Sequence, residues 1–148
     1  AAGGIANGRG VAAALILGAQ GVQVGTAFLA CEESNASSVH RDSLFSDQAK
    51  YTLLTRAFSG RLARGIRNRF AESMQSHNDD IMPYPIQSWI TGSFKQEAIK
   101  QRRGDLISLW AGQSAPLLKH RKAHDLFDEL VRDATRMLSN DLPLSVSV

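Results

Sequence analysis

A short apolar strand that runs through a glycine into a helix most strongly constrains how this chain folds. Gly21-Val22-Gln23-Val24-Gly25-Thr26 places two valines at alternate positions, and the helical run Ala27–Ala30 follows directly. A helix start leaves its first backbone N–H groups without intrahelical partners, and no bulky side chain here blocks an approaching phosphate. The stretch therefore predicts a phosphate-binding turn.

The opening of the chain repeats this arrangement. Ala1-Ala2-Gly3-Gly4-Ile5 is typical of a strand end entering a glycine turn, and a helix is expected from about Arg9 to Leu17. Asn7 is placed to cap the start of that helix and Gly18 to end it in a left-handed conformation. Two consecutive strand–glycine–helix units can hold one phosphate between them, as the loops after strands seven and eight of a (β/α)8 barrel do.

A second interpretation of the first unit stays open. Gly8-x-Gly10-x-x-Ala13 has the spacing of the dinucleotide-binding fingerprint of Rossmann folds. That fingerprint requires an acidic residue about 20 residues further on, at the end of the second strand. This chain has Gly25-Thr26 there, which disfavours the Rossmann interpretation.

Composition and charge are those of an ordinary globular domain. The 148 residues are 43% hydrophobic and 21% charged, and the net charge is only +3. The basic residues are spread along the chain, so nucleic acid is not an expected partner. No apolar run approaches the roughly 20 residues of a membrane span. The single cysteine, Cys31, cannot form an internal disulfide, which favours a reducing, cytoplasmic location. We expect Cys31 to be buried and to pack as a small hydrophobic side chain.

The chain after the polar loop Glu32–Ser38 is expected to be mainly helical. We expect a short helix within 42–50, a strand at 52–58, a helix at 67–75, an extended segment at 82–85, a helix that begins at a Ser93–Gln96 capping box and ends at Gly104, and an apolar run at 106–110. The clearest helix comes last, because its apolar residues follow one helical face: Ala123, Leu126, Phe127, Leu130, Val131, Ala134, Met137 and Leu138.

Two groups of side chains suggest chemistry but have simpler interpretations. Four arginines between Arg61 and Arg69 have the charge to hold an anionic substrate, yet a solvated or carboxylate-paired surface is favoured. His120 and His124 have the i, i+4 spacing of metal ligands, but no third ligand is evident. A helix surface is favoured for these histidines, and no metal site is expected.

Several short motifs along the chain are informative when they are taken together. They are Ala1–Gly10, Gly21–Leu29, Phe58-Ser59-Gly60-Arg61, Ala63-Arg64-Gly65, Pro83-Tyr84-Pro85 with Gln87, and Trp110-Ala111-Gly112-Gln113. In combination they resemble the C-terminal half of the flavin-dependent nitronate monooxygenases, formerly called 2-nitropropane dioxygenases, in their bacterial and fungal class I branch. The resemblance spans most of this chain.

The resemblance implies an α/β fold: the C-terminal part of a TIM (β/α)8 barrel that holds FMN, with an added, mainly helical lid domain. Residues 1–35 would supply the last two βα units, and residues 36–148 the outer helices and the lid. Carried over residue by residue, the FMN contacts are Gly4 and Gln23, Val24, Gly25 and Thr26, with Gly3 beside the phosphate. Tyr84 and Gln113 would approach the mouth of the active site, although packing is an equal rival for both.

The activity that the resemblance implies is oxidation of alkyl nitronates by O2 to carbonyl compounds and nitrite. The histidine base of that family belongs to a glycine-rich motif upstream of the matching segment, and none of the histidines here has that context. We therefore expect a piece of a longer enzyme, with no catalytic residue in this chain. A missing N-terminal part or a second copy of the chain would be its partner. The alternatives are a flavin-dependent NAD(P)H quinone or enoyl reductase of the same barrel type, or an inactive truncated fragment.

Overall fold

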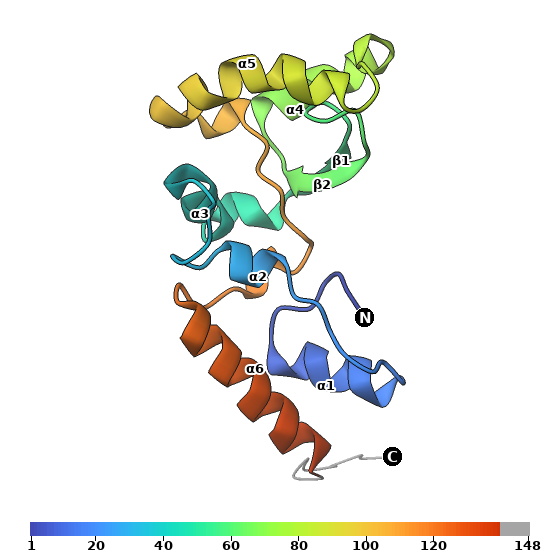
Figure 1. Cartoon of the computed structure of the whole chain (residues 1–148), viewed down its shortest axis with the longest axis vertical. Coiled ribbons are helices and arrows are strands. Elements are labelled where there is room, and N and C mark those ends of the chain that lie inside the picture. Colours follow the sequence, from blue (N-terminus) through green and yellow to red (C-terminus); the bar gives the residue numbers. More distant parts are fainter. Residues whose placement is uncertain (140–148) are drawn as a thin grey trace.

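The computed structural model describes residues 1–139, which form an elongated molecule (Figure 1). The main elements are α1 (Gly8–Ile16), α2 (Thr26–Leu29), α3 (Ser38–Leu44), β1 (Thr52–Thr55), β2 (Ala63–Ile66), α4 (Arg69–Ser73), α5 (Ile86–Lys100) and α6 (Ala123–Leu138). Helices α1 and α6 form one end of the molecule, with α2 nearer its middle, and the β-hairpin with α4 and α5 forms the other end. Short 3-10 helices lie at Asp47–Lys50, Met74–Asp80, Gly104–Leu106 and Ala115–Leu117.

The two opening segments lie side by side in parallel, as the barrel interpretation requires. Ala2 and Gln23 form a parallel bridge, and the Gln23 N–H donates to the Ala1 carbonyl at 2.8 Å. The expected strands are nonetheless reduced to this single bridge. A sheet strand gains stability from neighbours on both sides, and within residues 1–139 this bridge joins each segment only to the other.

Helix α1 lies within one residue of the predicted range and has the two predicted cap residues, Asn7 and Gly18. The Asn7 side chain accepts a hydrogen bond from the Gly10 N–H at 3.0 Å, which caps the start. Gly18 has a φ of +95°, and the Ala19 N–H donates to the Ala14 carbonyl at 3.0 Å. This is the Schellman pattern of a helix that ends in a left-handed glycine.

Gly8 allows α1 to cross α6 at very short range. A Cβ atom at Gly8 would lie 2.5 Å from the Asp133 Cβ and 2.8 Å from the Ala134 nitrogen. Gly8 and Gly10 also lie within α1 instead of in a loop before it. The dinucleotide-fingerprint interpretation is therefore wrong, because the first glycine of the pattern serves helix packing.

Helix α6 confirms the predicted last helix. Leu126, Leu130 and Ala134 are buried, and the first two pack in a core that includes Ala27 and Cys31. Cys31 is almost fully buried, as expected, and its thiol donates to the Ala27 carbonyl. Burial, with a smaller contribution from the charge of Glu33, raises the pKa of this thiol.

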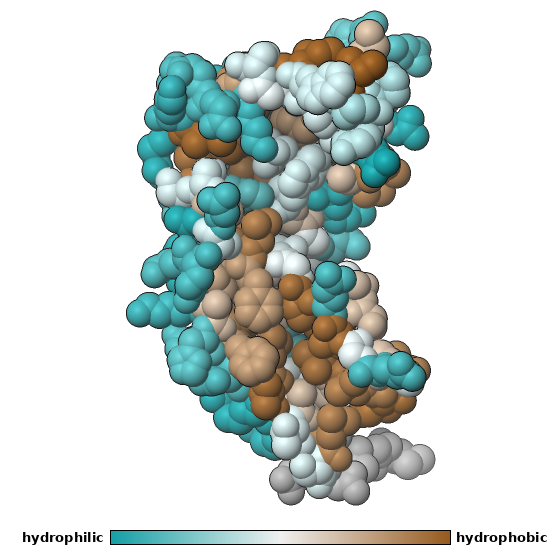
Figure 2. Space-filling model, in the orientation of Figure 1, coloured by the Kyte–Doolittle hydropathy of each residue, from teal (hydrophilic) through white to brown (hydrophobic). Residues whose placement is uncertain are grey.

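Part of the apolar face of α6 remains exposed. Phe127 and Val131 are 57% and 49% exposed. Ile16 and Leu17, at the C-terminal end of α1, are exposed to a larger fraction. Figure 2 shows apolar surface over the half of the molecule where α1 and α6 lie. Within the described residues, none of the helices has the length and apolar character needed to cross a bilayer.

The other end of the molecule is built on an antiparallel hairpin. Strands β1 and β2 pair Thr52 with Ile66 and Thr55 with Ala63, which confirms the first four residues of the predicted strand. The apolar run 106–110 adds an extended edge to it, since the Ile66 N–H donates to the Leu109 carbonyl at 2.8 Å.

Helix α5 differs most from the sequence prediction. It begins at Ile86, directly after Pro85, so the proposed capping box lies inside the helix and is wrong. The Ser93 hydroxyl instead donates to the Ile90 carbonyl. The helix also ends at Lys100, before Gly104, and the 82–85 segment closes in a turn at Tyr84 and Pro85. The true start was hidden because the buried face of α5 carries the polar residues Gln87 and Thr91.

Helices α3 and α4 begin at side-chain caps. Helix α3 starts at Ser38, four residues before the predicted position, because the Ser37 hydroxyl accepts from the His40 N–H. Helix α4 falls within the predicted 67–75 helix and is capped by Asn68, whose side-chain oxygen accepts from the Ala71 N–H at 3.0 Å.

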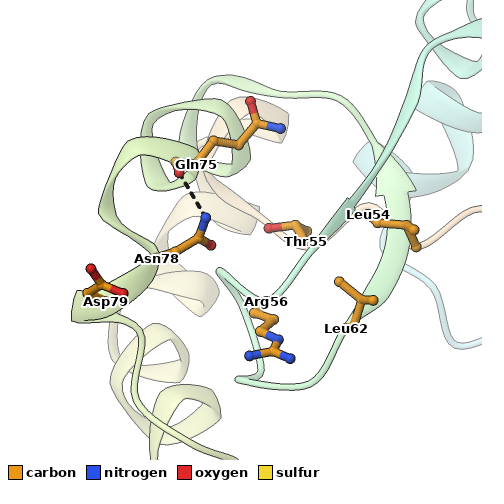
Figure 3. A pocket seen from close by; sticks show the side chains of 7 residues that line it. All are labelled: Leu54, Thr55, Arg56, Leu62, Gln75, Asn78 and Asp79. Atoms are coloured by element: carbon orange, nitrogen blue, oxygen red, sulfur yellow. Dashed lines mark hydrogen bonds between the residues drawn. The ribbon is translucent and has the colours of Figure 1, made fainter.

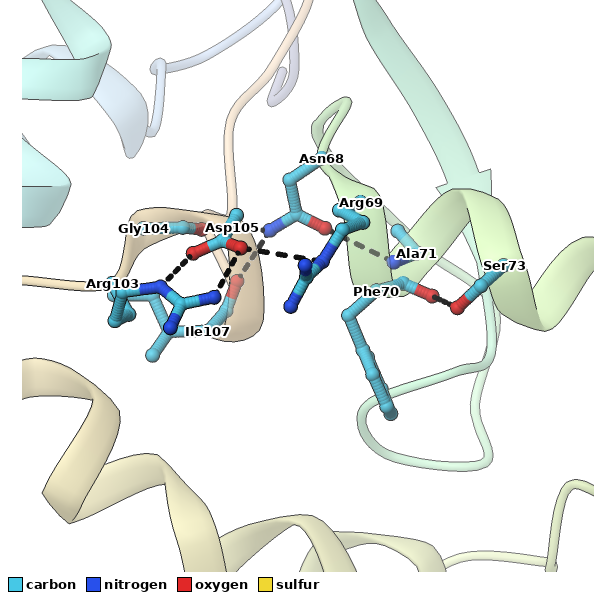
Figure 4. A network of polar contacts seen from close by, with 9 residues as sticks. All are labelled: Asn68, Arg69, Phe70, Ala71, Ser73, Arg103, Gly104, Asp105 and Ile107. Atoms are coloured by element: carbon cyan, nitrogen blue, oxygen red, sulfur yellow. Dashed lines mark hydrogen bonds and ion pairs between the residues drawn. The ribbon is translucent and has the colours of Figure 1, made fainter.

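Asn68 also ties α4 to the segment that follows α5 (Figure 4). Its side-chain N–H groups donate to the carbonyls of Gly104 and Ile107 at 2.9 and 2.8 Å. Beside it, Asp105 receives two hydrogen bonds from Arg103 and an ion pair from Arg69. The Arg103 guanidinium accordingly holds the pKa of Asp105 below its usual value. These contacts fix where the extended 107–112 segment begins.

We expect Asn68→Ala to lower the free energy of unfolding by about 3 kcal/mol, because it removes a helix cap and leaves two carbonyls without donors. Urea unfolding followed by circular dichroism measures this. Asn78→Ala is the matched control, since Asn78 is exposed and bonds only locally to Gln75; it should cost less than about 0.5 kcal/mol. Equal losses in the two variants would contradict the role of Asn68.

Candidate functional site

One cavity gathers all six residues that the sequence predicted for the cofactor. It has a volume of about 270 Å³ and lies between the two glycine turns. Its lining includes Gly3, Gly4, Gln23, Val24, Gly25 and Thr26, together with Ala2, Ile5, Gly112 and Ser114. The parallel pairing of Ala1–Ala2 with Gln23 places the two turns next to each other.

The glycine turns present bare backbone to this cavity. Gly3 and Gly4 have φ values of +90° and +73°, which glycine adopts without the steric cost of other residues. A Cβ atom built on Gly3, Gly4 or Gly25 would have no atom within 4 Å. The space beside these three residues is therefore open, and a phosphate group can approach their peptide N–H groups closely.

Thr26 joins the second turn to a distant part of the chain. Its hydroxyl oxygen accepts a hydrogen bond from the Gly112 N–H at 2.9 Å. A threonine hydroxyl has one donor besides its acceptor sites, so its proton can still be donated to a ligand oxygen. The contact fixes the direction of the hydroxyl, and it brings Gly112 and Ser114 to the cavity.

Sequence reasoning missed Gly112 and Ser114. It selected the residue between them, Gln113, which is exposed and does not line this cavity. The Trp110–Gln113 motif did locate the right segment. Gly112 and Ser114 face the cavity because Gly112 bonds to Thr26, 86 residues away in sequence. No local sequence pattern encodes such a contact.

The short length of α2 limits how much the helix itself contributes. It is a single turn, Thr26–Leu29, with Gly25 at its N-cap. A helix dipole needs several aligned peptide groups to build up charge at its end. Binding of a phosphate here would therefore depend on individual N–H groups and the Thr26 hydroxyl.

A buried histidine holds the 110–114 segment from its other side. His40 is 8% exposed, and its Nε2 lies 2.9 Å from the Trp110 carbonyl oxygen. Because a carbonyl only accepts, Nε2 carries the proton and donates. Burial lowers the pKa of His40, the Trp110 hydrogen bond opposes this, and the positive charge of Lys95 adds to the lowering. His40 and Thr26 thus hold Trp110 and Gly112 on either side of Ala111.

The other residues singled out from the sequence lie elsewhere. Tyr84 is exposed, with the Arg61 guanidinium 4.2 Å from its ring centre, and it is not part of the glycine-turn cavity. Arg64 donates to the Thr52 hydroxyl, whereas Arg67 and Arg69 pair with Glu72 and Asp105. Two of the four arginines therefore pair with carboxylates, as the paired-surface interpretation predicted, whereas Arg61 and Arg64 contact a ring and a hydroxyl.

His120 and His124 do not share a helix surface. His120 lies in the loop before α6 and contacts the carboxylate of Glu129, a buried residue of α6. His124 is exposed and pairs with Asp128. The i, i+4 spacing therefore does not place the two rings on one helical face, because α6 begins only at Ala123.

A larger cavity of about 500 Å³ opens near the tip of the hairpin. Figure 3 shows that it lies between the hairpin residues Thr55, Arg56 and Leu62 and the 3-10 segment that carries Asn78 and Asp79. The predicted site residues do not reach it. Cavity size alone therefore does not identify the functional site. The glycine-turn cavity is the better candidate, because its open glycine backbone and the Thr26 hydroxyl can bind a phosphate.

Comparisons with known proteins agree with the motifs. The sequence model of the family "Nitronate monooxygenase" matches residues 1–133. A probable nitronate monooxygenase of Staphylococcus aureus strain Newman is 44% identical over 138 residues, which cover 93% of this chain and 39% of that protein.

Two solved structures are similar in three dimensions. A nitroalkane oxidase from Streptomyces ansochromogenes has a TM-score of 0.85 and 35% identity, covering 95% of this chain and 40% of that one. FabK from Thermotoga maritima has a TM-score of 0.75 and 30% identity, covering 93% of this chain and 44% of that one.

The fold and the glycine-turn cavity define an α/β chain with the features of part of a barrel enzyme. With the family match, the chain belongs to the nitronate monooxygenase family. It spans about two fifths of the length of the relatives that it matches.

The buried His40 predicts a pH-dependent stability. Because its folded pKa lies below the ordinary 6.5, its contribution is complete above pH 6.5 and is lost as the pH falls through the folded pKa. Urea unfolding between pH 5 and 8 should show this decline, and His40→Gln, which keeps a donor but does not titrate, should remove it. His124→Gln is the exposed control and should retain the decline. The same pH profile in His40→Gln and the unaltered protein would contradict this.

Proposed function

We propose that this chain supplies the FMN phosphate site of an enzyme that oxidises alkyl nitronates with O2 to carbonyl compounds and nitrite. Residues 1–35 would be the last two βα units of a (β/α)8 barrel, and residues 36–148 its outer helices and lid. Family membership supports the activity, and the parallel Ala2–Gln23 bridge supports the barrel. The observation that carries the cofactor assignment is the open backbone cradle at Gly3, Gly4 and Gly25.

In this proposal the chain's own residues bind the cofactor and set its orientation. The peptide N–H groups of Gly3, Gly4 and Gly25 would surround the phosphate, and the Thr26 hydroxyl would donate its proton to a phosphate oxygen. Gln23 and Val24 line the same cavity and would lie beneath the flavin end of the cofactor. FMN, when bound, supplies the redox chemistry, and the protein sets its position.

The proposed reaction also needs a base that removes a proton from the substrate, and we assign none to this chain. The glycine-turn cavity is lined by small, apolar and amide or hydroxyl side chains, with no histidine or carboxylate. The base would come from a part of the parent enzyme outside this chain. The exposed faces of α1 and α6 would be covered by that part or by a second copy of the chain.

A flavin-dependent reductase that uses NAD(P)H is the second candidate. The similarity to FabK at 30% identity favours it as the runner-up. A third possibility is that the chain alone is inactive and binds no flavin. The two experiments below separate these outcomes.

We expect FMN mixed with the purified chain to co-elute in gel filtration, with a protein-bound visible absorption band. Thr26→Ala should weaken FMN binding at least about tenfold, since a hydrogen bond to a charged oxygen is worth about 1.5–3 kcal/mol. Thr135→Ala is the matched control, because Thr135 lies on α6 outside the cavity. Elution of all FMN with the small molecules would refute the site in this chain.

We further expect no catalysed nitronate oxidation by the FMN-loaded chain, because its cavity has no base. Oxygen consumption with propyl-1-nitronate should stay at the rate of free FMN. In parallel, NADH added without oxygen should not bleach the flavin. Saturable oxygen uptake would show that a base is present after all, and rapid bleaching by NADH would favour the reductase.

A further inference from the structure

The outward face of α5 carries an apolar patch in its N-terminal half. Trp89 is 70% exposed, and Ile86, Ile90 and the preceding Met82 are exposed by 40% or more. These four residues form the α5 patch, and Figure 2 shows apolar surface along the end of the molecule where α5 lies. Tryptophan and methionine are enriched in protein interfaces, and neighbouring exposed apolar side chains mark interaction sites. The α5 patch is therefore a candidate interface.

The inner face of α5 is occupied by the chain itself. Gln87 and Thr91 donate hydrogen bonds to two carbonyls just after β1, at 2.6 and 2.7 Å. The opposite side of the helix is a continuous exposed stripe with the helical spacing of three or four residues: Trp89, Ser93, Gln96 and Lys100. A partner can therefore reach the whole outer side of α5 without disturbing the contacts of its inner side.

Opposite charges lie at the two ends of this outer side. Asp79 and Asp80 end the 3-10 helix that precedes α5, next to its N-terminal end (Figure 1). Lys100 ends α5, about 16 Å along the helix from Trp89. The ion pairs within residues 1–139 leave Asp79 and Asp80 unpaired, and Lys100 has one exposed contact, with Glu97 at 3.6 Å. Such an exposed pair is weak, so Lys100 can bind another carboxylate.

This pattern of charges is complementary to itself. In a dimer with twofold symmetry, each contact between two different residues occurs twice, once in each direction. When two α5 helices lie antiparallel with Trp89 near the twofold axis, the acidic end of each copy meets the basic end of the other. A parallel arrangement would bring like charges together instead. The outer side of α5 therefore fits a second copy of the same chain.

We propose that two copies of this chain associate through their α5 patches, with the helices antiparallel. Asp79 and Asp80 of one copy would lie beside Lys100 of the partner subunit, and Trp89 would lie at the centre. Such an interface has an apolar core and a charged rim, as specific interfaces do. The inference does not rest on the proposed function. The exposed face of α1 and α6 lies at the other end of the molecule and stays free in this dimer (Figure 1).

Sedimentation velocity of the flavin-free chain over a range of concentrations tests the proposal. The sedimentation coefficient should rise from that of a monomer to that of a dimer below about 1 mM, where even weak specific interfaces become populated. Trp89→Ser should weaken the association at least about tenfold, because a central tryptophan is a typical interface hot spot. Phe127→Ser is the matched control, since Phe127 is similarly exposed but lies on α6, and it should dimerise like the unaltered chain.

Charge reversal tests the antiparallel arrangement. Asp80→Lys and Lys100→Glu should each weaken self-association about threefold or more at low salt, because each puts like charges across the interface. An equimolar mixture of the two variants should recover the dimer, since both charge contacts then join opposite charges. Recovery in the mixture would also show that both variants are folded.

The proposal is overturned if the chain stays monomeric at every concentration, or if Trp89→Ser associates as tightly as the unaltered chain. Association that is lost in Phe127→Ser but kept in Trp89→Ser would place the interface on α6 and also overturn it. A mixture that associates no more tightly than either charge variant alone would contradict the antiparallel pairing. FMN retention is measured separately, so failure of the flavin site would be distinguishable from failure of this interface.

Discussion

The structure depends on the extended 107–112 segment, which is hydrogen-bonded along its length to parts of the chain far away in sequence. Arg64 and Ile66 of β2 pair with it at Ala111 and Leu109. His40 donates to Trp110, and Thr26 accepts from Gly112. Figure 1 shows this segment running between the hairpin end and the end formed by α1 and α6. Backbone bonds with long-range partners thus connect the two ends of an elongated molecule.

Sequence patterns predicted the parts whose signals are local. Asn7 and Gly18 delimit α1, and the apolar face of α6 packs through Leu126 and Leu130, because caps and periodicity act within a few residues. The start of α5 was not predictable in this way. Its buried face uses Gln87 and Thr91, whose partners are carbonyls about 30 residues earlier, so the face has no apolar periodicity.

The candidate site follows the same division. The glycine turns were recognisable, since only small residues leave the backbone open, and the structure places Gly3, Gly4, Gly25 and Thr26 around one cavity. Gly112 and Ser114 reach it only through the Thr26 contact, so a local motif pointed to their neighbour Gln113. The roles of Tyr84 and Gln113 stay predictions.

The most direct test of the central claim is an amide NMR titration of the isotopically labelled chain with FMN and, separately, with riboflavin, which lacks the phosphate. The account predicts that FMN shifts the backbone amides of Gly3, Gly4, Gly25 and Thr26, while riboflavin leaves these amides nearly unchanged. Gly112 should follow Thr26 through their shared hydrogen bond. Equal shifts with both ligands, or FMN shifts confined to other residues, would contradict a phosphate site formed by the two glycine turns.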